Sequence, residues 1–409
     1  MKYILIVIIF ILILIPIIKV KNDKSKLYQL PFLYSITILG FIFPSLVSNF
    51  KLNYISDQEF NLFSINLILC FSAALIGYRI YSKKYIPKFF NKYKDDTYTS
   101  IVISIFFFIG FSISITIDPY EYGNEQGGFF AIKQLFARFL RPTALIIFCF
   151  YLVKKTNYRL VLLMLWLFLT SRFIIISGRR SELFTFFITI GFPLFFIKNY
   201  IPTKGIIALL ITISGFAFII MPVARNFTKK GDFGKLLELD FSEISGNYIQ
   251  GKKTNEIFES AVDLNSVYQN NAYSYGAIAI NKFTHQYVSS TIFGKEFKEK
   301  SKITTADFEK LRKYNYKHGN FKGYLARTGF VDTFFDFGFF SFIFYFIFGM
   351  ISKHYFIIAY KSNDIFSKIF YSQFSIYIFL SVYDSLFRIL VLIIPFLLIF
   401  HSIKNTSKS

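Results

Sequence analysis

Runs of about 20 apolar residues recur along this chain of 409 residues, and they restrict its possible folds more than any other feature. Such runs have no place in a water-soluble domain, because one hydrophobic core cannot bury so many of them. The sequence therefore predicts an all-α polytopic membrane protein. About eleven transmembrane helices are expected, near residues 3–18, 29–48, 61–79, 99–117, 137–153, 159–177, 182–198, 205–223, 331–351, 367–384 and 387–403.

Two of these expected helices have alternative interpretations. Tyr3 to Ile18 resembles a signal peptide, but lysines follow it and a small-residue cleavage site does not, so we expect a retained helix. Arg138 and Arg141 interrupt the start of the run at 137–153. Phe129 to Leu140 is therefore either joined to that span or an amphipathic helix in the membrane interface.

One long polar segment separates the eighth and ninth expected spans. A connection of this length, rich in polar, aromatic and charged residues, indicates a small domain at the membrane surface. The chain is expected to divide into an N-terminal bundle of about eight helices (1–223), one large outer loop domain (224–330) and a C-terminal part (331–409). The last part would hold about three helices and a short tail.

Short stretches of the loop have helical spacing. Thr254 to Gln269 places Ile257, Ala261, Leu264 and Val267 on one face, which predicts a surface helix with one buried side. Similar patterns predict helices at 235–245, 277–288 and 308–313.

The formal net charge of +22 lies mostly in short connectors between the expected spans. Membrane topology explains this charge, so no nucleic-acid partner is expected. Alternate connectors are rich in lysine, while the others include the acidic turn Asp118 to Glu121. The positive-inside rule places the basic connectors in the cytoplasm. We therefore expect a protein of the inner (cytoplasmic) membrane, with its N-terminus outside, its C-terminus in the cytoplasm and residues 224–330 on the outer face.

Common catalytic and metal-binding patterns are missing from the sequence. Cys70 and Cys149 lie inside apolar runs, which excludes a disulfide scaffold or a cysteine-based metal site as an organising device. The chain has no Gly-rich phosphate loop before Lys-Ser/Thr, no HExxH, no CxxC, no Gly-x-Ser-x-Gly and no Asp-x-Asp. We therefore expect neither a metal nor a cofactor.

An arginine-rich turn, Ser177 to Ser181, joins the sixth and seventh expected spans. Arg172 lies inside the sixth span, where a cation is costly unless it faces a water-filled cavity or an anion. Arg179, seven residues later, is expected on the same helical face, and Arg180 follows it. Guanidinium groups that converge at the outer leaflet suit a pyrophosphate, because each offers bidentate donors and a permanent charge. The alternative is a pair of arginines that snorkel at a helix end.

Other candidate site residues lie in or beside the long loop. Arg225 begins it and Arg327 ends it, and both are candidates for binding the pyrophosphate. His285 and His318 lie within it, and a histidine beside an anionic headgroup can act as a general base. The alternative is a surface histidine without such a role.

Charged pairs near the C-terminal spans have two interpretations. Asp332 and Asp336 begin the ninth expected span, where either is a candidate base or the partner of an arginine. Asp384 and Arg388, in the last outer turn, are expected to form a structural ion pair.

Three segments together resemble a known family. Ser177 to Leu183 is similar to the turn S/T-G-x-R-G/S-x-L, Tyr273 to Gly276 lies near the middle of the large loop, and Gly329 to Phe339 is an aromatic Phe-Gly segment that leads into the next span. This layout resembles the Wzy-type oligosaccharide repeat-unit polymerases, which make O-antigen and capsular polysaccharide. The wider relatives of that family include the O-antigen ligases.

The resemblance implies a fold similar to the C-type membrane glycosyltransferases, without a metal. It also implies polymerisation of undecaprenyl-pyrophosphate-linked oligosaccharides at the outer face of the cytoplasmic membrane. A growing glycan would pass from its carrier lipid to the sugar terminus of another lipid-linked repeat unit. The implied partners are these lipid-linked oligosaccharides, the lipid bilayer and a polysaccharide chain-length regulator.

The resemblance also assigns roles to individual residues. Arg180 occupies the arginine position of the family's turn, while Arg179 occupies a variable position. Arg225 resembles the second arginine that such enzymes place at the start of the loop. His318, before Gly329, is similar to the ligases' acceptor-activating histidine, but Gly319 replaces the Asn that usually follows, so His285 remains an alternative.

Two other functions are compatible with this layout. An O-antigen ligase would use the same donor and a different acceptor. A flippase for lipid-linked oligosaccharides would use Arg172 and its neighbours to line a translocation path, with charged residues in several spans and in both leaflets.

Overall fold

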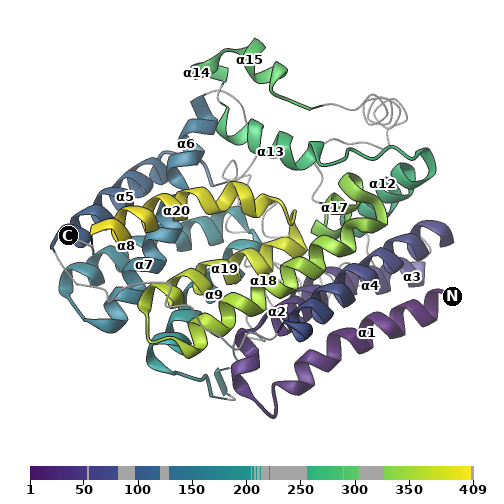
Figure 1. Ribbon diagram of the computed structural model, residues 1–409, viewed down its shortest axis with the longest axis horizontal. Helices are drawn as coiled ribbons and strands as arrows, with labels where there is room; N and C mark the ends of the chain where they lie inside the picture. The colour runs from purple at the N-terminus through teal and green to yellow at the C-terminus, as the bar shows by residue number, and fades with distance from the viewer. Residues whose placement is uncertain are drawn as a thin grey trace, which may run out of the picture.

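The computed structural model of the protein describes residues 1–52, 55–81, 97–119, 129–203, 256–288, 290–303 and 327–406, together with isolated positions between 205 and 221. The elements within these ranges are all helical (Figure 1). Their bounds are α1 (Lys2–Lys19), α2 (Leu30–Thr37), α3 (Phe43–Leu52), α4 (Asp57–Ile80), α5 (Thr97–Ile115), α6 (Phe129–Ala137), α7 (Leu140–Val153), α8 (Asn157–Ser177), α9 (Arg180–Lys198), α12 (Glu256–Asn270), α13 (Ala277–Tyr287), α14 (Ser290–Phe293), α15 (Lys295–Lys300), α17 (Gly329–Phe337), α18 (Ser341–Lys361), α19 (Ile365–Tyr383) and α20 (Arg388–Thr406).

Nine helical segments of the described chain are long and apolar enough to cross a membrane. They are α1, α2–α3, α4, α5, α6–α7, α8, α9, α17–α18 and α19. In α20, the stretch Leu392–Ile403 is a shorter apolar helix. The expected span at 205–223 falls largely outside the described residues. The prediction of an all-α, polytopic membrane protein is confirmed at this level.

Local sequence signals explain where several of these helices begin and end. Ser56 and Glu59 form a reciprocal capping box at the start of α4. Asp364 accepts hydrogen bonds from the backbone N–H groups of Phe366 and Ser367 at the start of α19. Asn199, with φ 52°, ends α9 in the left-handed conformation that asparagine tolerates better than most residues.

The expected run at 137–153 is longer than predicted and is broken. The segment 129–153 forms two helices, α6 and α7, separated by a turn at Arg138 and Phe139. The α6 helix packs against α5 and against the surface helix α13.

Contacts between helix ends define the two ends of the bundle. The Lys2 ammonium group pairs with the Asp57 carboxylate at 2.6 Å, so the starts of α1 and α4 meet. The α12 helix packs against α3, α4 and α17 at this end, which we call the loop end. The N-terminus lies at the loop end and the C-terminus at the opposite end (Figure 1).

Two apolar cores hold the helices together. One is formed mainly by α1, α2, α4 and α17–α19 and includes the inner face of α12. The other is formed mainly by α5, α7, α8 and α20, with residues of α19. The α9 helix contributes side chains to both, so the start of α9 lies between the two cores.

Glycines allow the central helices α4 and α18 to approach closely. A Cβ atom on Gly77 would overlap the carbonyl oxygen of Phe346, and one on Gly349 would overlap that of Ala74. Without a strong hydrophobic force between helices in lipid, small residues at such crossings let backbones pack directly. Beside this crossing, Ser341 donates a hydrogen bond to the Asn66 side-chain oxygen at 3.3 Å.

The long loop contributes helices where the sequence predicts them. Ile257, Ala261, Leu264 and Val267 of α12 are all buried, which confirms the predicted inner face. The prediction for residues 277–288 is confirmed by α13. The predicted helices at 235–245 and 308–313 lie outside the described residues.

Candidate functional site

The arginine-rich turn lies at the loop end of the bundle, between α8 and α9. The α8 helix ends at Ser177 because Gly178 adopts the left-handed conformation, with φ 58°. Arg179 is the N-cap of α9 and its backbone N–H donates to Ser177 Oγ at 3.3 Å. The expectation that Arg172 and Arg179 share one helical face is therefore wrong, because Arg179 has left the α8 helix.

Arg180 begins α9 and its guanidinium group lies over an aromatic ring. The guanidinium carbon is 5.1 Å from the centroid of the Phe41 ring, within cation–π range. Phe41 belongs to a short π-helical turn, Ile38–Ile42, between α2 and α3. A π-helical turn inside a longer helix is rare and often marks a functional position. Through Phe41, Arg180 lies beside a group of aromatic rings that includes Phe379 and Tyr383 of α19.

A second charged contact holds the same turn from the other side. The Arg141 Nη2 of α7 donates to the Glu182 Oε2 of α9, and the two side chains are 27% and 16% exposed. Glu182 lies in the first turn of α9, where the helix dipole favours a negative charge. This ion pair fixes the start of α9 against α7.

The sequence alone does not reveal this ion pair. The available signal was Arg141 within an apolar run, because a cation at that depth requires an anionic or polar partner. Glu182 directly follows the arginine-rich turn. The two lie 41 positions apart, and sequence spacing alone does not bring α7 and α9 together.

Arg172 is bound to the end of a neighbouring helix. Its Nη1 donates to the carbonyl oxygen of Ile115, the last residue of α5, at 3.1 Å. A cation at a helix C-terminus interacts favourably with the unsatisfied carbonyl groups there. Arg172 therefore joins α8 to the end of α5.

The surface helix α13 covers part of this region. It packs against α6, α17 and α20. Tyr287 at its end lies within electrostatic reach of Arg138 in the α6–α7 turn. Burial raises the pKa of Tyr287 to about 12, against the opposing charge of Arg138, so the phenol stays protonated at neutral pH. The other candidate on this helix is His285, whose side chain lies outside the described residues.

A small cavity lies directly below the Arg141–Glu182 pair. Its volume is about 30 Å³, and its walls include Ser114, Thr170 and Thr189 as well as the charged pair. A space of this size with several polar groups can hold one water molecule. The cavity beside the start of α9 therefore has mixed walls, because Leu140, Trp166, Phe173 and Phe186 line it as well.

Arg327 has a different environment. Its Nε donates to Asp263 Oδ2 of α12 at 2.9 Å, and its guanidinium carbon lies 4.4 Å from the centroid of the Phe335 ring. Burial raises the pKa of Asp263 above its ordinary value, and the charge of Arg327 opposes this effect. These contacts favour a structural role for Arg327, in which it fastens α12 to the returning end of the loop.

Two of the segments that carry the family resemblance contact one another. The backbone N–H groups of Ser274 and Tyr275 donate to the carbonyl oxygens of Phe335 and Asp336 at 2.9 and 3.0 Å. The Asp336 carboxylate accepts hydrogen bonds from Ser274 Oγ and from the backbone N–H of Ile278 in the first turn of α13. Asp336 therefore positions the start of α13 against the end of α17.

The glycines of these two segments face aromatic rings of the opposite segment. Gly276, with φ 89°, lies beside Phe337, and Gly338, with φ 58°, lies beside Tyr273. Both conformations favour glycine, and a side chain at Gly338 would come within 3.1 Å of the Tyr273 ring. The contact explains why a Phe-Gly pair lies at the start of the span.

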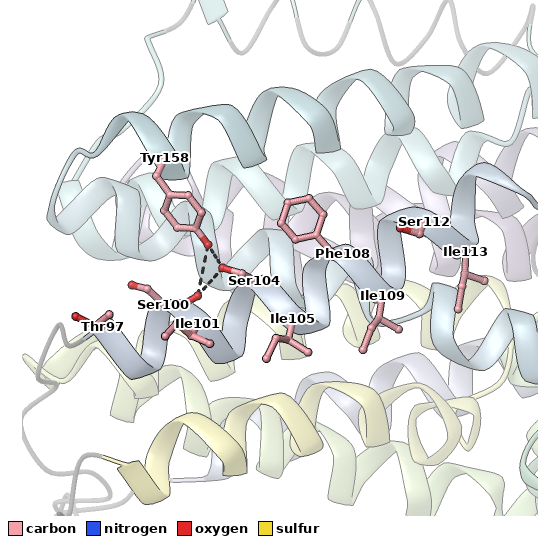
Figure 2. A pocket seen from close by; sticks show the side chains of 10 residues that line it. All are labelled: Thr97, Ser100, Ile101, Ser104, Ile105, Phe108, Ile109, Ser112, Ile113 and Tyr158. Carbon is pink, nitrogen blue, oxygen red and sulfur yellow. Dashed lines mark hydrogen bonds between the residues drawn. The ribbon is translucent and has the colours of Figure 1, made fainter.

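A groove follows the outer surface of α5 and is lined by that helix together with Tyr158 of α8. Figure 2 shows Tyr158 bonded to Ser104 and to the Ser100 carbonyl near one end, and Ile113 at the other. The groove has a volume of about 750 Å³ and mostly apolar walls. Ile113 lies two residues before the Ile115 carbonyl that Arg172 binds.

The described residues therefore place Arg179, Arg180 and Arg172 at the loop end, and they add Arg141, Glu182 and Arg138 to the candidate site. Arg225 and His318 lie outside the described residues, as does the side chain of Arg388. Their predicted roles remain predictions.

A scan against protein-family models and searches of curated proteins and of solved structures gave no match to this chain.

Proposed function

We propose that this protein polymerises lipid-pyrophosphate-linked oligosaccharide repeat units at the outer face of the cytoplasmic membrane. The observation that carries the proposal is the start of α9. There Arg179 and Arg180 form the turn, and the Arg141–Glu182 pair holds it at the loop end. Guanidinium groups gathered at this end of the bundle match the charge of a pyrophosphate.

The charge distribution supports an orientation with the loop end outside. Lysines gather at the opposite end of the bundle, in the connectors and the helix segments beside them. They are Lys19, Lys21, Lys24, Lys26, Lys154, Lys155, Lys198, Lys353, Lys361 and Lys368. The positive-inside rule assigns this end to the cytoplasm. The N-terminus and the arginine-rich turn are then outside, and the C-terminus is inside.

The proposed reaction is a transfer of a glycan between two lipid-linked chains. A sugar hydroxyl of the acceptor attacks the anomeric carbon of the donor glycan. A new glycosidic bond forms as the bond to the pyrophosphate oxygen breaks. Arg180 and Arg179 stabilise the negative charge that develops on the leaving lipid pyrophosphate. A base accepts the proton of the attacking hydroxyl, and His285 and His318 are the candidates for this role.

The covering helix and the groove suit such a substrate. The α13 helix lies over the α6–α7 turn, where it can orient the glycans beside the arginines. The apolar groove along α5 offers the isoprenoid tail a place that ends near Arg172. The tail would then lie in the bilayer while its pyrophosphate reaches the loop end.

Deletion of the gene, followed by gel analysis of surface and lipid-linked glycans, tests this proposal. A polymerase deletion leaves single repeat units on the final acceptor and no ladder above them. Long chains that remain on the carrier lipid, with none transferred, would instead identify a ligase. Repeat units that accumulate on the cytoplasmic side would identify a flippase and would contradict the proposed chemistry.

A further inference from the structure

The loop helices α14 and α15 expose an unusual amount of apolar surface. Ile292, Phe293 and Phe297 are 65%, 52% and 53% exposed, and the two phenylalanine rings stack with their centroids 5.6 Å apart. Adjacent apolar side chains rarely remain exposed to water unless they contact a partner or a membrane. Figure 1 shows α14 and α15 beyond α13, projecting from the helix bundle.

Neighbouring segments extend this surface. Ile280 and Phe283 of α13 and Ile303 after α15 are also exposed. The Asn281 side chain accepts from the Ile303 backbone N–H at 2.8 Å and donates to the Ile303 carbonyl oxygen at 2.7 Å. These bonds tie the end of the segment back to α13. We call the six residues Ile280, Phe283, Ile292, Phe293, Phe297 and Ile303 the loop patch.

The position and charge of the loop patch indicate its partner. The α13 helix packs on α6 and α20 at the loop end, so α14 and α15 follow within a few residues of the membrane surface. Residues 290–303 contain four lysines and two glutamates, a net charge of +2. Lys300 and Lys302 pair with Glu296 and Glu299, Lys298 is buried, and Lys295 is exposed near the apolar side chains. Aromatic and aliphatic side chains combined with lysine are typical of segments that lie in a lipid interface.

We propose that the loop patch inserts into the outer leaflet, with the exposed lysines of α15, Lys295 and Lys300, beside anionic lipid headgroups. This anchor would hold α13 close to the membrane beside the start of α9. The inference depends on the membrane-spanning fold and not on the reaction proposed above. The test of this inference therefore does not depend on whether the protein is a polymerase.

The single tryptophan of the chain, Trp166, makes a direct fluorescence test possible. In a Trp166→Phe background, Phe293→Trp and Phe297→Trp are reconstituted into nanodiscs of phosphatidylcholine and phosphatidylglycerol with brominated acyl chains. Phe168→Trp, 71% exposed on the span α8, is the control for contact with lipid. Tyr275→Trp, 72% exposed on the loop but outside the loop patch, is the control for contact with water.

We expect the brominated lipids to quench Phe293→Trp and Phe297→Trp at least half as strongly as Phe168→Trp, and iodide to quench them weakly. Tyr275→Trp should show the opposite pattern. Quenching of the patch variants by iodide to the level of Tyr275→Trp, without quenching by lipid, would overturn the inference. Protection from both quenchers would also overturn it, because the patch would then be covered by protein.

A second probe covers the case in which the Trp166→Phe background does not fold. Phe297→Cys in the otherwise unchanged protein is labelled with an environment-sensitive fluorophore, since the native cysteines Cys70 and Cys149 are buried. Emission blue-shifted to that of the same dye on a Phe168→Cys protein supports insertion. Emission equal to that of the dye in buffer contradicts it.

Discussion

The position of Arg180 predicts a large effect of a single substitution on polymerisation. Its guanidinium group lies over Phe41 at the start of α9, where we place the leaving pyrophosphate. We expect Arg180→Ala to lower the polymerisation rate by roughly 10²- to 10³-fold, comparable to the loss of one preorganised donor in other enzymes. Arg180→Lys should recover part of the rate, because lysine keeps the charge but loses the bidentate geometry.

The measurement is the ladder of surface glycans at matched protein levels, with membrane extraction and size-exclusion profiles as checks of folding. Arg79→Ala is the control, since Arg79 is an exposed arginine at the opposite end of the bundle. Wild-type ladders from a well-expressed Arg180→Ala protein would remove Arg180 from the site.

The Arg141–Glu182 ion pair is expected to hold the start of α9 in place rather than to take part in the reaction. Reversal of one charge, in Arg141→Glu, places two carboxylates together in a partly buried site. We expect this to destabilise the protein by about 3 kcal/mol and to abolish polymer. The double variant Arg141→Glu with Glu182→Arg restores an ion pair of opposite sense and should recover both stability and part of the activity.

A double-mutant cycle on thermal unfolding in detergent measures this coupling. A coupling energy near zero would show that the two side chains act independently. Recovery of stability without any recovery of polymer would show that Arg141 itself, and not only the ion pair, serves the reaction.

At the scale of elements, the glycines of the α4–α18 crossing predict a sharp difference between similar substitutions. Gly349→Ala forces a methyl group onto the Ala74 carbonyl oxygen, so the two helices must move apart. We expect a loss of about 1–3 kcal/mol, as for other overpacked interiors. Gly191→Ala in α9 meets no atom within 4 Å and should be neutral or slightly stabilising, because alanine favours the helix.

Melting temperatures of the two variants in the same detergent are the test. Equal melting temperatures for Gly349→Ala and Gly191→Ala would mean that α4 and α18 do not cross at Gly349 as described.

The attachment of α12 predicts a pH dependence. Burial raises the folded-state pKa of Asp263 above its ordinary value of 3.8, so the folded protein holds this proton more tightly than the unfolded chain does. The resulting stability is present below that ordinary value and is lost as pH rises through the raised pKa. Asp263→Asn cannot ionise. The melting temperature of the wild type, relative to this variant, should therefore fall as pH rises above 3.8 and through the raised pKa of Asp263.

A difference in melting temperature between the wild type and Asp263→Asn that stays constant as pH rises would contradict the raised pKa of Asp263. Arg327→Met is a useful companion variant, because removal of the opposing cation should move the transition to higher pH.

The elements that the sequence predicts best are those with a strong local pattern. Periodicity alone locates α12, because Ile257, Ala261, Leu264 and Val267 all point inwards. Predictions from residue spacing are wrong where a helix ends between the two residues. Gly178 ends α8, so Arg179 does not share a helical face with Arg172. Residue spacing also cannot find partners that only tertiary packing brings together, such as Arg141 with Glu182.

For the whole molecule, we predict its orientation in the membrane, which decides on which side the proposed site lies. The arginine-rich turn and α12–α15 lie at one end of the bundle and the lysine-rich connectors at the other. We expect alkaline phosphatase to be active when fused after residue 270 and inactive when fused at the C-terminus. A C-terminal green fluorescent protein should fluoresce. The reverse pattern would place the proposed site in the cytoplasm and exclude a reaction at the outer face.

Reconstitution of the purified protein shows whether it polymerises lipid-linked repeat units and whether Arg180 is required. Lipid-linked repeat units extracted from the deletion strain are the substrate, and the chain lengths of the lipid-linked products are measured over time. We expect the wild type to build a ladder and to release lipid pyrophosphate, and a folded Arg180→Ala protein to do neither. A folded wild-type protein that leaves single repeat units unchanged, or an Arg180→Ala protein that builds the same ladder, would contradict this expectation.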